Sequence, residues 1–337
     1  MTRQLYLHIG MPKTGTTYVQ SVLHAAAGRL AAQGLTMLPG TRRGNIQLSA
    51  AIRDAAPEDD QRRVARFAKR LAAVGTPRTL VSDELLGGAT SAQIATFLEA
   101  CPDVEVHVVV SVRSLSRLLP STWQQRIQQR GETPSLPEFL DAVVSRHGDL
   151  AERWWTDRGV VPVLERWSEH VPLERMHVIT MPGAGTDPRS LVERYAALLG
   201  LDPATLDVEV ARANVSLGWA QAEVLRLVRE RVPRALATKQ DYLPVGKAWL
   251  GAQHLAPQHG APPRMPSTLR GWCEDEAAAT IAWLAERPID VMGDPEDLRP
   301  ADGDFVDDFT LDAAVIADAA IAALTSIALE RTLEKRS

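Results

Sequence analysis

Residues 7–20, LHIGMPKTGTTYVQ, join a short apolar run to a Gly-Pro-Lys cluster and then to a helix-like segment. Within them, residues 10–15 have the G-x-x-x-x-G spacing of a Walker A phosphate-binding loop, which also lies between a strand and a helix. A Walker A loop continues with Lys and Ser or Thr, whereas this chain has Thr16 and Thr17 there and a lysine three positions earlier, at Lys13. Backbone N–H groups at such a helix N-terminus attract anions. The stretch therefore predicts an anion-binding loop that differs from the ATP-binding type.

Composition and charge limit the class of protein. With 337 residues, 45% of them hydrophobic and 23% charged, the chain can bury a large core. A formal net charge of -5 argues against a surface that coats nucleic acid, so any anion site must be local. Cys101 and Cys273 are too few for a disulfide framework or a zinc site. No signal peptide or membrane span is expected, which predicts a cytoplasmic protein.

Apolar runs alternate with helix-period segments over the first 200 residues, and this alternation is typical of βαβ units and a parallel sheet. The continuous β-branched run at 104–113 predicts a central strand that is buried on both faces. The predicted strands cover residues 5–11, 79–84, 104–113 and 176–181. The predicted helices cover residues 15–33, 59–74 and 187–200.

After residue 201 we expect no further strands, but helices near 217–231, 267–287 and 311–334. The last of these is predicted to be an amphipathic helix that docks on its own domain, with homodimer formation as the alternative. The predicted fold class is α/β: a P-loop-like parallel β-sheet flanked by helices, with a helical C-terminal elaboration. We expect a single domain over 1–337, with an α/β core at 1–201 and a mainly helical part at 202–337.

A second pattern follows the predicted central strand. The segment VVVSVRSLSRLLPS, residues 108–121, carries Arg113 at the strand end and Ser121 eight positions later. The loop and this pattern together resemble the sulfotransferases that use 3′-phosphoadenosine 5′-phosphosulfate (PAPS). In that family a P-K-x-G-T-T loop holds the 5′-phosphosulfate, and an arginine and a serine at this spacing hold the 3′-phosphate. The resemblance covers residues 5–129 well, and 159–201 is similar to bacterial members in a vaguer way.

The resemblance implies PAPS as co-substrate and adenosine 3′,5′-bisphosphate (PAP) as product. It places Lys13 beside the leaving oxygen as a catalytic residue, so that no metal is expected. Arg212, in the segment RANVSLGW, is similar to part of the loop that closes over the nucleotide. The residues implied in co-substrate binding are Pro12, Lys13, Thr14, Gly15, Thr16, Thr17, Arg113, Ser121 and Arg212.

The acceptor hydroxyl has a high pKa and benefits from a general base. The second predicted strand ends in Ser-Asp-Glu at the same sheet edge, and bacterial and heparan-type sulfotransferases are similar in placing a glutamate there. Glu84 is the predicted base, with Asp83 and His8 as alternatives. A helix-capping or ion-paired carboxylate is the structural explanation that competes for Glu84.

The predicted function is transfer of a sulfuryl group to a hydroxyl, or an amine, of a small-molecule, glycan or lipid acceptor. The pattern predicts neither a nucleic-acid partner nor a membrane span. Two alternatives stay open. One is a small-molecule kinase that uses Mg-ATP, although no strand ends in a clear Walker B aspartate. The other is a non-catalytic nucleotide-binding protein that has kept the fold.

Overall fold

The computed structural model describes residues 2–54, 58–127, 133–183, 185–207, 209, 217–232 and 243–334. Contacts divide the chain into two compact units. The first, called the sheet unit, comprises residues 1–115, 146–212 and 273–300. The second, called the helical unit, comprises residues 116–145, 213–272 and 301–337. The organisation as a single domain stays a prediction.

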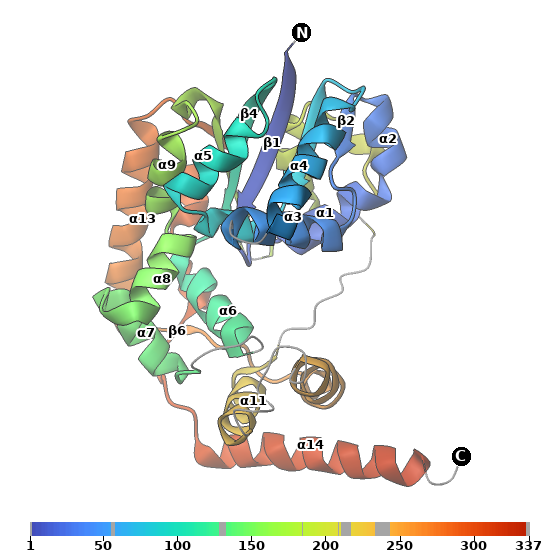
Figure 1. Ribbon diagram of the computed structural model, residues 1–337. Coiled ribbons are helices and arrows are strands. Elements are labelled where there is room, and N and C mark those ends of the chain that lie inside the picture. The colour runs from blue at the N-terminus through green and yellow to red at the C-terminus, as the bar shows by residue number, and fades with distance from the viewer. Residues whose placement is uncertain are drawn as a thin grey trace. The chain divides into compact units, whose positions relative to one another are not determined.

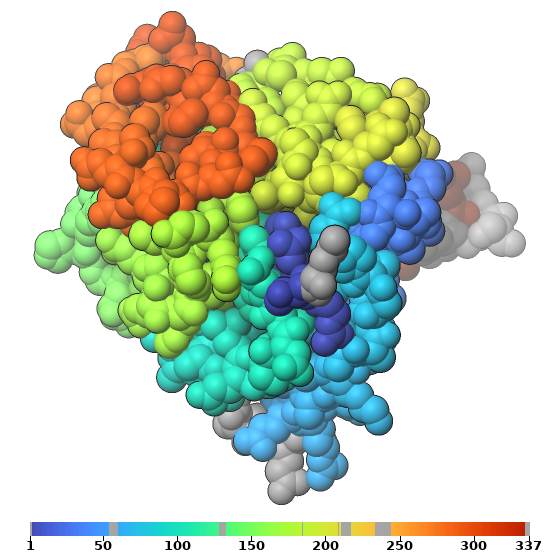
Figure 2. Space-filling model, turned by 90° about the horizontal axis from the view of Figure 1, so that it is seen from above, coloured from blue at the N-terminus to red at the C-terminus, as the bar shows by residue number. Residues whose placement is uncertain are grey.

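The sheet unit is built on six parallel strands in the order β2-β3-β1-β4-β5-β7 (Figure 1). The strands are β1 Arg3–Gly10, β2 Leu35–Met37, β3 Arg78–Ser82, β4 Val104–Val112, β5 Met176–Thr180 and β7 Asp290–Met292. The four predicted strands are confirmed, and the fold class is the α/β class that the sequence predicts. In Figure 2 the first strand, in dark blue, lies in the middle of the unit, as its pairing with both β3 and β4 requires.

The expectation that no strand follows residue 201 is wrong. β7 pairs in parallel with β5 through Val178 and Val291, and so extends the sheet at one edge. A run of three residues is too short for a periodicity signal, and none of its three residues is fully buried. The sequence also gave no indication of β2, another three-residue edge strand.

Helices cover both faces of the sheet because successive residues of a strand point to opposite sides. Leu5, Leu7 and Ile9 of β1 pack on one side, and Tyr6 packs on the other. The first side is covered by α3 Arg42–Asp54, α4 Glu58–Ala72, α5 Ser91–Glu99, α9 Val160–Ser168 and α13 Arg270–Ala285. The second side is covered by α1 Thr16–Ala25, α2 Ala27–Ala32 and α10 Arg189–Leu198. The helix predicted over 15–33 is therefore two helices, because Ala26 leaves helical geometry (φ -94°, ψ 6°).

The helical unit holds most of the remaining secondary structure. Its helices are α6 Leu115–Ile127, α7 Leu136–Ser145, α11 Trp219–Arg231, the π-helix η5 Leu243–Leu255 and α14 Ala313–Glu334. Two short strands, β6 Met265–Pro266 and β8 Phe305–Val306, pair in parallel. Helix α8 Gly148–Arg158 belongs to the sheet unit.

Helix α14 docks on its own unit, as predicted, but it is not amphipathic. It packs against α11 and η5, and Gln258 Nε2 donates to the carbonyl of Ala319 at 3.1 Å. Small residues, Ala319 and Ala323, occupy the packed face, while large aliphatic side chains such as Ile321 and Leu324 are exposed. The segment Ala313–Leu333 has a mean hydropathy of 1.7 and is 11% buried. Among the described residues, this helix is long and apolar enough to span a membrane by length and composition alone, and the expected absence of a membrane span stays a prediction.

Candidate anion-binding and active site

The loop after β1 adopts a backbone that few residues tolerate. Lys13 has φ 71° and Gly15 has φ 78°, both in the left-handed region. A Cβ atom on Gly15 would lie 2.6 Å from Cδ2 of Leu191, so glycine suits both the conformation and the space. A lysine in this region carries backbone strain of the kind that is found at functional sites. The loop thus keeps Lys13 in a conformation that the surrounding structure has to maintain.

The loop leads directly into a helix N-terminus that lacks a cap. Gly15 is the N-cap of α1 without a side-chain cap bond, and the first turn contains no acidic residue. The first backbone bonds to Gly15 come from Tyr18 and Val19, so the N–H groups of Thr16 and Thr17 precede the intrahelical ladder. Such donors, together with the ammonium of Lys13, suit an anion. The residues of the predicted loop are therefore brought together as the motif requires.

The threonine side chains of this loop have separate partners. The Thr14 hydroxyl is fully buried, donates to the carbonyl of Met11 at 2.7 Å and lies 2.7 Å from Ser111 Oγ. Its backbone, and not its hydroxyl, is thus left to face a ligand. The Thr16 hydroxyl donates to a carboxylate oxygen of Glu84. Pro12 and Thr17 are half-buried.

Arg113 follows the last residue of β4, as predicted, and is tied to the loop. Its Nη1 donates to the carbonyl of Lys13 at 3.0 Å. The end of β4 and the loop after β1 thereby form one structural element at the carboxyl edge of the sheet. Ser121 lies within α6 in the helical unit, in the second turn and next to the intrahelical Pro120. Its share in a phosphate clamp stays a prediction, and Arg212 lies outside the described residues.

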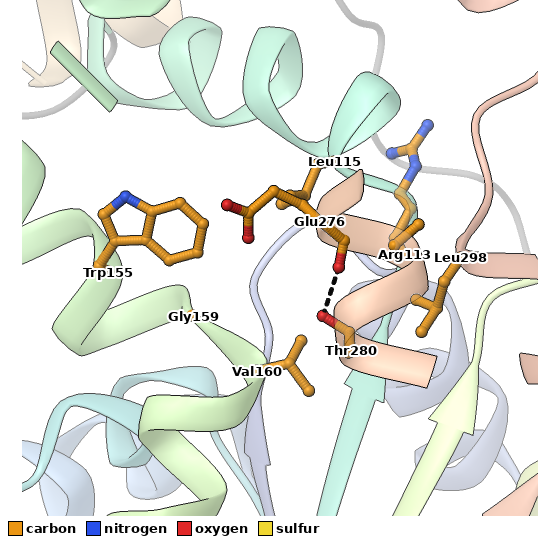
Figure 3. A pocket seen from close by; sticks show the side chains of 9 residues that line it. Arg113, Leu115, Trp155, Gly159, Val160, Glu276, Thr280 and Leu298 are labelled. Atoms are coloured by element: carbon orange, nitrogen blue, oxygen red, sulfur yellow. Dashed lines mark hydrogen bonds between the residues drawn. The ribbon is translucent and has the colours of Figure 1, made fainter. Parts of the chain in front are cut away.

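A small pocket beside Arg113 does not serve as the nucleotide site. It has a volume of about 30 Å³, which is room for one or two waters. Trp155, Val160, Thr280 and Leu298 line it, and the guanidinium of Arg113 extends away from them (Figure 3). The charged end of Arg113 is thus directed elsewhere, in agreement with its bond to the loop.

Glu84 begins a short 3-10 helix, η1 Glu84–Gly88, immediately after β3. Its side chain is half-buried and receives the hydroxyl of Thr16. A Cβ on Gly10 would lie 3.7 Å from the carbonyl oxygen of Glu84, so the two backbones run close together. The β3 end therefore places a carboxylate at the loop, at the sheet edge where the sequence predicted Glu84 from its position at a strand end and from the family resemblance.

Asp83 is the N-cap of η1. Its Oδ1 accepts the N–H of Leu85 at 2.9 Å, and its side chain is buried. Burial raises the pKa of Asp83 to about 6, against the opposing effect of the Leu85 bond. Helix capping, the structural alternative to a catalytic role for Glu84, is thus the role of Asp83.

His8 lies beneath the loop in a buried polar network. Its Nδ1 is 2.7 Å from Ser82 Oγ, and its Nε2 is 3.0 Å from Ser111 Oγ and 2.9 Å from the hydroxyl of Tyr195. Gln20 Nε2 donates to Ser82 Oγ at 3.0 Å. Burial lowers the pKa of His8 to about 4, although the charge of Glu84 opposes the shift. Both ring nitrogens are engaged, which disfavours His8 as a base for substrate.

Sequence reasoning missed the partners of His8. Ser111 was detectable, because it is the one hydroxyl residue in the mostly apolar strand β4, which neighbours β1 in the sheet; Ser82 shares β3 with Thr79 and was less distinctive. Tyr195 gave no such signal, since it reaches His8 from α10, 187 residues away.

These two shifted pKa values predict opposite pH effects on stability. In the unfolded chain His8 binds a proton below its ordinary pKa of 6.5, whereas in the folded chain it does so only below a pKa of about 4. His8 therefore makes the free energy of unfolding rise with pH between these two values. Folded Asp83 keeps its proton up to about pH 6 and the unfolded chain loses it near 3.8, so stability falls with rising pH. A pKa displaced by about two is worth roughly 3 kcal/mol. The two effects oppose each other across nearly the same window.

We expect the variants Asp83→Asn and His8→Gln to expose these effects when urea unfolding is measured from pH 4 to 7. The free energy of unfolding of Asp83→Asn, minus that of the wild type, should increase as pH rises through the window. For His8→Gln the same difference should increase as pH falls. Subtracting the free energy of unfolding of the wild type at each pH removes the contribution of the groups that the variants share with it. Difference curves that stay level would contradict the assigned pKa values.

Comparisons with known proteins add the following. Neither protein-family profiles nor curated proteins give a match to this chain. Among solved structures, the chain is similar to a sulfotransferase from Alicyclobacillus acidocaldarius, with a TM-score of 0.43 and 14% sequence identity. The alignment covers 66% of this chain and 91% of that chain. The catalytic and binding roles of the residues above stay predictions.

Proposed function

We propose that the protein is a PAPS-dependent sulfotransferase. The observation that carries the proposal is the bond from Arg113 to the carbonyl of Lys13, which ties the arginine of the second sequence pattern to the loop of the first. A loop with an uncapped helix N-terminus and a lysine suits a phosphosulfate, and a separate guanidinium suits a second phosphate.

In this proposal the residues divide the chemistry between them. The acceptor oxygen attacks sulfur in line, its bond to sulfur forms as the bond from sulfur to the bridging oxygen breaks, and the leaving group is PAP. Lys13 stabilises the negative charge that develops on that bridging oxygen. Glu84 takes the acceptor proton, and the donated hydroxyl of Thr16 orients its carboxylate. The loop and the helix N-terminus hold the reactants in position.

A kinase that uses Mg-ATP is the competing proposal. Magnesium would need a carboxylate that faces the loop. Asp83 is buried and caps η1, whereas Glu84 reaches the loop through Thr16, so ligand binding has to decide between the two proposals. Thermal unfolding with PAP alone and with Mg-ATP separates the two. Stabilisation by PAP without magnesium supports the sulfotransferase, and stabilisation by Mg-ATP but not by PAP supports the kinase. Incubation with PAPS and an acceptor panel, followed by a search for a mass gain of one sulfate, tests turnover.

Replacement of Arg113 tests how the co-substrate is recognised. We expect Arg113→Ala to lower kcat/KM for PAPS by roughly 10- to 100-fold, because one charge-assisted contact is worth about 1.5 to 3 kcal/mol. For adenosine 5′-phosphosulfate, which lacks the 3′-phosphate, kcat/KM should fall much less. Steady-state kinetics with the two donors measures the preference.

The second donor also controls for the bond from Arg113 to the loop. Loss of loop support would lower kcat/KM for both donors equally, whereas loss of a 3′-phosphate contact lowers it for PAPS alone. Arg113→Lys, which keeps the charge but not the planar fork, should retain part of the preference. An unchanged preference in Arg113→Ala would show that the 3′-phosphate is recognised elsewhere.

A further inference from the structure

A hollow of about 440 Å³ lies between α3 and α4 on the sheet unit. One wall is formed by Arg63, Arg66 and Arg70 of α4. The apolar side chains of Leu48 and Phe67 also line it, and both are buried. The hollow thus combines a cationic wall with an apolar lining, as sites for organic anions do.

The three arginines share one face of α4 because they are spaced by three and four residues. Like charges at this spacing repel one another, so a bound anion would stabilise the arrangement. Arg63 has a partial counter-charge in Asp60, whose carboxylate lies 3.7 Å away. Arg70 Nη2 donates to the carbonyl of Pro39 at 3.2 Å, which fixes this side chain across the hollow. In a chain of net charge -5, this is a local concentration of positive charge.

The opposite wall belongs to the segment after β2 and to the first turn of α3. Thr41 and Gly44 line it, and the N–H of Gly44 donates to Thr41 Oγ1 at 3.1 Å. The first turn of α3 begins here at Arg42, so its dipole adds positive potential on this side. Both walls therefore favour a negative group between them.

Strand order places the hollow next to the candidate active site. The loop with Lys13 follows β1, Glu84 follows β3, and the segment from Pro39 follows β2, and these three strands are neighbours in the order β2-β3-β1. Parallel strands lie about 4.8 Å apart, so the end of β2, from which the Pro39 wall of the hollow leaves the sheet, is on the order of 10 Å from the end of β1. Helix α3 also packs against η1, which starts at Glu84. Arg113, after β4, is on the other side of the loop.

We propose that this hollow binds the negative group of the sulfuryl acceptor, and that the acceptor is an organic oxyanion. A carboxylate, sulfate or phosphate would lie against Arg63 and Arg66, and the ring or chain that bears it would lie on Leu48 and Phe67. The reacting hydroxyl would then extend towards Glu84. The assignment of this ligand as acceptor rests on the proposed function, whereas binding of the anion does not.

Binding of phenyl phosphate tests the proposal by calorimetry with saturating PAP, which occupies the loop. The double variant Arg63→Gln/Arg66→Gln should weaken binding at least 10-fold. The control Arg62→Gln/Lys69→Gln removes the same charge from the same helix, but neither residue lines the hollow, so it should change binding less than 2-fold. Benzyl alcohol, which has a similar ring without the charge, should bind much more weakly to the wild type.

The outcomes separate this inference from the proposed function. The hollow is overturned as a site if both double variants lose the same affinity for phenyl phosphate. It is also overturned if the wild type does not bind phenyl phosphate in the presence of PAP. Binding that persists in Arg63→Gln/Arg66→Gln but disappears in Lys13→Ala shows that the probe occupies the loop, which also overturns it. If PAP does not bind while phenyl phosphate still distinguishes the two double variants, the anion site stands and the proposed function is wrong.

Discussion

Lys13→Ala is expected to lower kcat by roughly 10²- to 10³-fold, the range found when a group that stabilises developing negative charge is removed. PAP lacks the transferred sulfuryl group and should still bind, because the backbone donors of the loop and Arg113 remain. Single-turnover kinetics with PAPS, together with calorimetry of PAP, measures the two effects separately.

The backbone at Lys13 supplies a matched control for this prediction. Because φ is 71° there, alanine keeps the strain of a Cβ atom in the left-handed region, whereas glycine removes it. Lys13→Gly should therefore lose as much kcat as Lys13→Ala. Its free energy of unfolding, however, should be about 1 kcal/mol higher than that of Lys13→Ala. Full activity in either variant removes the Lys13 ammonium from the mechanism. If Lys13→Gly were both more stable and more active than Lys13→Ala, the conformation of the loop, and not the charge of Lys13, would determine kcat.

Glu84→Gln is expected to lower kcat by roughly 10²-fold or more, since loss of a general base has effects of this size. Glutamine keeps the shape of the side chain and an oxygen that accepts the Thr16 hydroxyl, so PAPS affinity should hardly change. Steady-state kinetics with PAPS and an acceptor measures kcat and the KM for PAPS in both proteins.

Asp83→Asn and His8→Ala provide the comparison. Both residues are buried and hydrogen-bonded, so their replacement should alter stability more than kcat. If either of them, and not Glu84→Gln, abolishes turnover with PAP binding intact, the base is misassigned. The sulfotransferase proposal would survive that result.

The sequence predicted those parts of the fold that have a local physical signal. The long apolar run of β4 and the glycine-rich loop before α1 are examples, since burial on both faces and a turn each require particular residues nearby. The position of Glu84 at a strand end, together with the family resemblance, also predicted the sheet edge at which the structure has it. Strand β7 and the bond from Tyr195 to His8 were not predictable in this way, because each depends on a partner more than 100 residues away.

The late position of β7 in the chain has a consequence for biosynthesis. While the ribosome is still adding residues 201–289, β5 is an open edge of the sheet, with backbone donors and acceptors that can pair with another nascent chain. The helix α13, which packs on one face of the sheet, arrives only shortly before β7. A product truncated at residue 201 would keep the loop and both strand ends of the candidate site, yet expose this edge permanently. Chaperone demand and aggregation should therefore depend on the last third of the chain, far in sequence from the residues that carry the chemistry.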